Sequence, residues 1–211
     1  MKGLVLKDLY LIKGNIRTLA IALVGFTVMA FNDMATISFI IPFFAVMMCI
    51  STFSYDEFNK WNAYAITLPG GKKTIVRSKY ISTILLIIIS SVISVLASII
   101  IGNIKGDTNY EEIMSTLIGG LFGITLVVSL MYPFIYKFGN EKGRLFLFII
   151  VFLITALGGA LLSVININEI NPPAIISFID KYGFYIMPAL TLIILYISYI
   201  VSLKIFQNKD F

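Results

Sequence analysis

Residues 80–104 read YISTILLIIISSVISVLASIIIGNI and contain no charged side chain. An α-helix needs about 20 predominantly apolar residues to cross the hydrocarbon core of a bilayer, so this stretch predicts a transmembrane helix. Four further stretches of this length without charged residues predict other spans: residues 34–55, 113–136, 145–168 and 182–203. Residues 18–32 are also free of charge but number only 15, so they predict a span in which residues 9–12 extend the helix and Arg17 reaches the headgroups. The sequence therefore predicts an all-α integral membrane protein with six transmembrane helices.

The composition points to the same class of protein. Of the 211 residues, 59% are hydrophobic and only 13% are charged. A soluble domain of this size does not need so many successive apolar runs, whereas a six-helix membrane bundle is built from them. We expect one transmembrane domain over residues 1–211.

The basic residues predict the orientation in the membrane. With the N-terminus inside, 14 of the 16 Lys and Arg residues fall in cytoplasmic segments, and only Lys105 and Lys181 fall outside. Because Lys and Arg favour the cytoplasmic side of short loops, we expect a multi-pass membrane protein with both termini cytoplasmic. The positive net charge is spread along the membrane edges, so it predicts contact with membrane lipid and no nucleic acid partner.

Two short segments outside the spans are expected to be helical. Residues 1–16 place apolar residues near one face and Lys or Asp mostly opposite, which is typical of an interfacial helix on the inner leaflet. Residues 165–183 contain the apolar piece 174–179, which is too short to cross the membrane. We expect a short extracellular or re-entrant helix there.

The longest polar interruption of the chain is residues 55–80, YDEFNKWNAYAITLPGGKKTIVRSKY. The first half predicts a helix that carries Phe58, Trp61, Ala65 and Leu68 along one stripe, with a stop at the Pro-Gly-Gly of residues 69–71. The chain is expected to restart as a helix at residue 74. Two helices joined by this turn would form a cytoplasmic coupling loop.

The chemistry of an enzyme is missing from the sequence. There is no histidine, which removes the commonest general base and metal ligand. The single Cys49 fits no metal-ligand spacing. Gly71-Lys72 resembles the end of a phosphate-binding loop, but Ile66 replaces its first glycine and Lys73 its Ser or Thr. We expect no catalytic residue, no metal and no cofactor in this chain.

Simpler interpretations of the loop stay open. Trp61 and Tyr64 are also the residues that anchor a chain at the headgroup layer. The basic residues of the second half would serve equally to set the topology and to hold anionic lipid: Lys72, Lys73, Arg77 and Lys79.

The opening MKGLVLKDLYLIK, the pattern YDE-x-N-x-W-x-x-Y-x-x-x-LP and the following IV-x-SKY resemble the short permeases of the ABC-2 exporter superfamily. Within that superfamily the chain is similar to the phenol-soluble modulin exporter permeases. It departs from the pattern after Leu-Pro, where Gly70, Gly71, Lys72 and Lys73 stand in place of a small residue and an arginine.

The resemblance implies a permease subunit of the bacterial cell membrane that exports amphipathic or membrane-active peptides. Its partners would be a cytoplasmic ABC ATPase subunit, which holds the ATP and Mg, and a second permease copy or paralogue, as in a homodimer. The residues that the resemblance assigns to ATPase docking are Asp56, Glu57, Asn59, Trp61, Tyr64, Leu68 and Pro69 in the loop and Lys7 and Asp8 on the interfacial helix.

Two other classes of function compete with this one. A membrane scaffold or sensor would use the same loop to recruit a cytosolic partner without transport. A secondary carrier would bind its ligands through neutral side chains. The substrate and the residues of a transport path are not predicted by the sequence.

Overall fold

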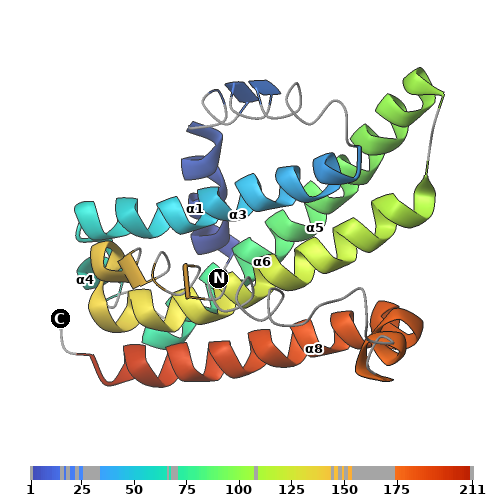
Figure 1. Ribbon diagram of the computed structural model, residues 1–211. Coiled ribbons are helices and arrows are strands. Elements are labelled where there is room, and N and C mark those ends of the chain that lie inside the picture. The colour runs from blue at the N-terminus through green and yellow to red at the C-terminus, as the bar shows by residue number, and fades with distance from the viewer. Residues whose placement is uncertain are drawn as a thin grey trace.

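The computed structural model describes residues 2–14, 34–65, 67, 71–106, 109–143 and 174–209, together with residues 17, 20–21, 24–25, 145–146, 149 and 152–153. Every regular element in this part of the chain is a helix (Figure 1). The helices are α1 (Lys2–Gly14), α3 (Met34–Phe58), α4 (Trp61–Ala65), α5 (Gly71–Lys105), α6 (Tyr110–Phe138) and α8 (Ala174–Gln207).

Four of the described helices are long and apolar enough to cross a membrane. They cover Thr36–Phe58, Gly71–Lys105, Tyr110–Phe138 and Ile186–Gln207, and each contains most or all of one of the six charge-free stretches. The two other expected spans, residues 18–32 and 145–168, lie mostly outside the described residues. The structure thus shows a helical membrane protein, and the number of six spans stays a prediction.

The long helices α3, α5, α6 and α8 run side by side, and α1 crosses α3 and α5 near one end (Figure 1). We call this the inner end, because it carries the segments predicted to face the cytoplasm. Here Lys72 of α5 donates to the carbonyl of Gln207 (3.0 Å), and Lys209 donates to the carbonyl of Tyr136 (3.1 Å). The inner end therefore gathers α1, the start of α5 and the ends of α3, α6 and α8.

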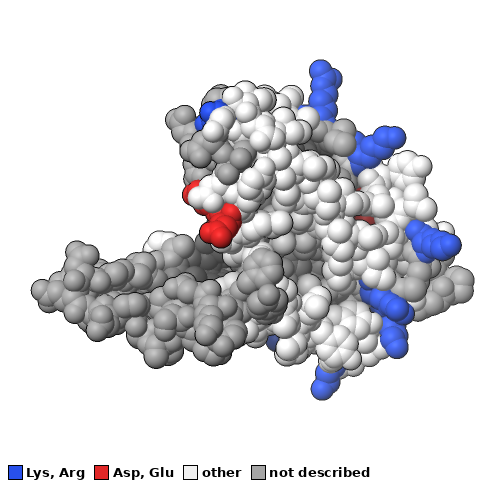
Figure 2. Space-filling view, turned by 90° about the vertical axis from the view of Figure 1, so that its right-hand side faces the viewer, with Lys and Arg blue, Asp and Glu red and all other residues white. Residues whose placement is uncertain are grey.

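The opposite end of the bundle carries exposed acidic side chains. Figure 2 looks onto this end and shows acidic side chains gathered at one place, with basic side chains toward the periphery. Glu111 and Glu112 are exposed in the first turn of α6, where Asn109 accepts a hydrogen bond from the Glu112 N–H (3.4 Å). Carboxylates near a helix N-terminus are stabilised by the helix dipole.

The orientation in the membrane can be tested with two exposed positions. A cysteine in place of Tyr110 is expected to react with an impermeant thiol reagent in intact cells, whereas a cysteine in place of Asn59 at the inner end is expected to react only after lysis. The native Cys49 is buried, so it gives little background. The reverse pattern would invert the predicted topology.

Small side chains allow α5 to pack closely against α3. Ser90, Ser94, Ser98 and Gly102 are buried at intervals of four residues along α5, and the hydroxyl of Ser98 lies 3.0 Å from that of Ser38. Such small-residue faces bring helix backbones close together in membranes. The apolar side of the same helix, with Ile88 and Ile93 among others, is exposed in this chain.

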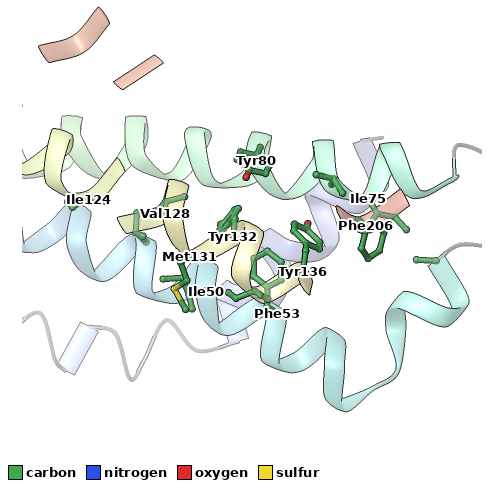
Figure 3. Packing of buried hydrophobic residues seen from close by; sticks show 14 residues of the cluster. Ile50, Phe53, Ile75, Tyr80, Ile124, Val128, Met131, Tyr132, Tyr136 and Phe206 are labelled. Carbon is green, nitrogen blue, oxygen red and sulfur yellow. The ribbon is translucent and has the colours of Figure 1, made fainter. Parts of the chain in front are cut away.

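Near the inner end, aromatic rings fill the space between the helices (Figure 3). The ring centroids of Tyr80 and Tyr132 are 5.0 Å apart, those of Phe53 and Tyr132 are 4.9 Å apart, and those of Tyr136 and Phe206 are 5.1 Å apart. All five side chains are buried. These rings join α3, α5, α6 and α8 into one packed core, which gives the inner end a rigid base.

A glycine of α6 marks a close contact with α3. A Cβ atom built on Gly120 would lie 2.5 Å from the ring of Phe39, whereas one built on Gly119 or Gly123 meets nothing within 4 Å. Because overpacking costs about 1–3 kcal/mol, we expect Gly120→Ala to be less stable than Gly119→Ala by about that amount. Thermal unfolding in detergent measures the difference, and equal stabilities of the two variants would contradict the close contact.

Three expected boundaries differ from the structure. The first half of the 55–80 loop is not one helix, since α3 continues to Phe58 and turns at Asn59 and Lys60, where Lys60 has a left-handed φ of 49°. The next long helix begins at Gly71, not at residue 74, and continues without a break through its span. The region 165–183 was expected to contain a separate short helix, but its described part, residues 174–183, forms the beginning of α8.

Candidate functional site

Four charged side chains lie in contact at the inner end, where α1 packs against α3 and α5. We call them the charge cluster: Lys7, Asp8, Asp56 and Lys79. They come from three helices, because Asp56 lies near the end of α3 and Lys79 in the third turn of α5. Asp8, Asp56 and Lys79 are only 2%, 4% and 5% exposed. Charged residues are almost never buried to this degree unless they are paired.

Lys79 is the centre of the charge cluster. Its Nζ lies 2.9 Å from Asp8 Oδ1, 2.7 Å from Asp56 Oδ2 and 2.8 Å from the hydroxyl of Thr52. The ammonium group donates hydrogen bonds to Asp8 and Thr52, whereas its contact with Asp56 Oδ2 is an ion pair without hydrogen-bond geometry. Lys7 contacts the second oxygen of Asp56 and lies 3.4 Å from Asp8. Each carboxylate therefore faces both ammonium groups.

The cluster is electrically neutral, and its hydrogen bonds are nearly complete. Ser82 on α5 donates to the second oxygen of Asp8 (3.3 Å). Removing one partner of a buried ion pair is costly, because the charge that remains is desolvated and unpaired. The arrangement consequently favours one position of α1 relative to α3 and α5, and resists a displacement of one helix without the others.

Helix α4 is attached to the charge cluster through Trp61. The ammonium of Lys7 lies 4.6 Å from the centre of the Trp61 ring, within cation–π distance. The indole is half-buried against the aromatic core, and its ring centre lies 5.4 Å from that of Tyr64. Ala65, at the end of α4, is buried. A movement of α4 would therefore pull on α1 as well as on the core.

A second link joins the end of α3 to the segment after α6. The carboxylate of Glu57 accepts a hydrogen bond from the backbone N–H of Asn140 (2.8 Å), and the Asn140 side chain donates to Ser54 (2.6 Å). Gly139, the residue before Asn140, has a φ of 86°, and a Cβ atom built on it would lie 2.9 Å from the Glu57 carboxylate. Glycine is required here for its left-handed conformation and for the close approach of the carboxylate.

The turn between α3 and α4 presents large apolar side chains to the outside. Phe58 is 86% exposed and Tyr64 is 60% exposed, while Tyr55, Asn59 and Lys60 are exposed around them. We call these five residues the elbow surface. An exposed group of aromatic residues with a polar rim has the composition of a protein interface.

A cavity of about 310 Å³ lies beside the elbow surface. Its walls combine the rings of Phe53 and Tyr136 with the charged side chains of Asp56, Glu57 and Lys60. The Tyr136 hydroxyl is buried and has no hydrogen-bond partner among the described residues. Through Asp56 the cavity borders the charge cluster.

The structure divides the residues that were predicted for docking into three groups. Asp8 and Asp56 are buried members of the charge cluster, Lys7 is its partly exposed member, and Trp61 is partly exposed beside it. Glu57, Asn59 and Tyr64 are exposed. Leu68 and Pro69 lie outside the described residues. Direct contact with a partner is thus available to the second group, and the role of all nine in docking stays a prediction.

Sequence reasoning missed the partners that complete the site. Lys79 was interpreted as a topology or lipid residue, but it is buried and does not reach lipid. Thr52, Ser82 and Asn140 were not singled out. A signal for Lys79 existed, since it directly precedes the charge-free stretch 80–104 and shares one helix with it. Its carboxylate partners lie 71 and 23 positions away in the sequence, which the pattern does not reveal.

The sequence was compared with known proteins. The model of a family described as "ABC-2 family transporter protein" matches residues 3–207. No curated protein and no solved structure gave a significant match. The match covers every helix described above except for the first residue of α1.

Proposed function

Because the chain belongs to the ABC-2 family of transporter proteins and is therefore a permease subunit of an ABC transporter, we propose that a separate cytoplasmic ATPase drives it through the elbow surface. In this proposal the chain is an exporter subunit with a second permease copy or paralogue as its partner. The cargo is an amphipathic or membrane-active peptide.

The observation that carries the proposal is the attachment of the elbow surface to the rest of the bundle. Phe58 and Tyr64 are exposed, but helix α4 between the elbow surface and the core is held in place. Its Trp61 contacts Lys7, and Lys7 is ion-paired within the charge cluster. A force on the elbow surface would thus act on α1, α3 and α5 together. Closure of an ATPase dimer is a source of such a force.

The length of α5 allows a displacement at the inner end to reach the opposite end of the bundle. Residue 71 begins a single helix that continues to Lys105, so α5 carries a displacement at the inner end along 35 residues. An α-helix rises about 1.5 Å per residue, and a helix of this length reaches beyond the hydrocarbon core. The continuity of α5 supports its role as a lever between the elbow surface and the opposite end.

The choice of cargo rests on the chemistry of the predicted spans. The charge-free stretches contain apolar, hydroxyl and amide groups, which suit a ligand with one apolar side and one weakly polar side. Ion-coupled carriers normally keep an ionisable residue at depth. The resemblance to peptide exporters supports the same class of cargo.

The proposal is tested by purifying the tagged chain from its native membrane in mild detergent and identifying the proteins that accompany it. We expect a stoichiometric subunit with a phosphate-binding loop and ATPase activity. Inside-out vesicles that contain both subunits are then expected to take up a fluorescent amphipathic peptide when ATP is added. An ATPase without uptake would refute the cargo, and absence of an ATPase after crosslinking in the membrane would favour the scaffold or secondary carrier.

A further inference from the structure

A groove of about 500 Å³ runs between α6 and α8, away from the charge cluster. It extends along α6 from Ser129 to Lys137 and along α8 from Ile194 to Ile205. At 1.5 Å per residue these stretches are about 12 Å and about 16 Å long. Most of its lining is apolar and includes Leu130, Pro133, Phe134, Ile194, Ile197 and Val201. Its size is that of a small-molecule site.

The base of the groove is held in place by hydrogen bonds. The Ser198 hydroxyl on α8 donates to the carbonyl of Ser129 on α6 (2.6 Å), and it lies 2.7 Å from the hydroxyl of Tyr80 on α5. These bonds join three helices directly beneath the groove. The base of the groove is consequently part of the packed bundle.

The inner end of the groove is positively charged. Lys137, which lines it, is exposed, and its ammonium lies 5.0 Å from the centre of the Phe138 ring. Lys204 is exposed on α8 three residues after Val201, so it lies on the same side of that helix. The long stems of both lysines allow their ammonium groups to reach the headgroup level.

We propose that this groove binds an anionic phospholipid from the leaflet at the inner end, with an acyl chain between α6 and α8 and the phosphate on Lys137 and Lys204. Leu130, Ile197 and Val201 line the groove and are exposed in the described chain, so an acyl chain removes apolar surface that has no other cover there. Basic pockets between membrane helices bind the headgroups of anionic lipids. A zwitterionic lipid offers the same acyl chain without the net charge.

The proposal is tested with vesicles of equal parts phosphatidylglycerol and phosphatidylcholine. The chain is extracted in mild detergent, and the lipids that remain bound are measured by mass spectrometry. We expect phosphatidylglycerol to exceed phosphatidylcholine roughly 30-fold, the preference that two cations at an anionic surface provide. Recovery of the two lipids in their vesicle ratio would overturn the proposal.

Two pairs of variants separate the groove from general surface charge. Lys137→Gln with Lys204→Gln is expected to abolish the preference, whereas Lys73→Gln with Arg77→Gln, which removes the same charge from exposed positions on α5, is expected to keep it. Val201→Trp fills the groove and is expected to release the lipid, while Ile193→Trp lies on α8 outside the lining. Equal effects within either pair would overturn the proposal. A disulfide between two copies of the Val201→Cys variant in vesicles would also overturn it, because a second copy would then cover the groove in place of the lipid.

Discussion

Replacing Lys79 by methionine is expected to lower the free energy of unfolding by about 3–5 kcal/mol, the usual cost of breaking a buried ion pair from one side. Methionine has a similar length, but it cannot pair with Asp8 or Asp56 or donate to Thr52. Lys7 alone would then face two buried carboxylates. The measurement is thermal or denaturant-induced unfolding of the purified chain in detergent.

Two further variants show that the loss comes from the charge cluster. Lys73→Met, an exposed position on the same helix, is expected to change the stability by less than about 0.5 kcal/mol. Adding Asp56→Asn to Lys79→Met removes one of the stranded charges and is expected to recover part of the loss. A loss below about 1 kcal/mol for Lys79→Met would mean that water reaches the carboxylates and that the cluster does not hold α1.

Replacing Phe58 and Tyr64 together by alanine is expected to weaken ATPase binding at least 100-fold while leaving the chain inserted and folded. Aromatic residues at the centre of an interface typically cost 2 kcal/mol or more each when truncated. Both side chains are exposed in the described chain, so their loss creates no cavity in the core. The measurement is the amount of ATPase that co-purifies with equal amounts of the variant and the unaltered chain.

The matched control for this pair is Tyr196→Ala with Ile193→Ala. These residues are as exposed as Tyr64 but lie on α8, far from the elbow surface in the sequence and in a predicted span. They are expected to retain the ATPase fully. Full retention by the Phe58 and Tyr64 variant would exclude the elbow surface as the docking site, and equal loss by both pairs would indicate a general defect.

The two predictions also separate the two kinds of residue that the sequence grouped together. Asp8 and Asp56 are assigned to docking by resemblance, but their side chains are directed into the protein. Their replacement would act first on the stability of the inner end and through it on docking. Tyr64 and Glu57 are exposed, and Tyr64 is expected to affect binding without a change in stability.

Much of the architecture could be predicted because it depends on local properties. A run such as residues 80–104 predicts a spanning helix by itself, since a lipid-exposed backbone must form its hydrogen bonds within one segment. The resemblance to ABC-2 permeases is confirmed by the family match over residues 3–207. The break at Asn59 and Lys60 was missed, because neither residue is a strong helix terminator and the left-handed φ of Lys60 depends on its surroundings.

The sequence by itself determined the helical class, the charge-free stretches, the polar loop and the family, because each of these depends on residues that are close together in the chain. The tertiary structure alone decided which charged residues are buried. Lys7 and Asp56 are 49 positions apart and Asp8 and Lys79 are 71 positions apart, yet they form one neutral cluster. Their pairing depends on how α1 crosses α3 and α5, and an ammonium group is stable away from water only where packing brings carboxylates to it.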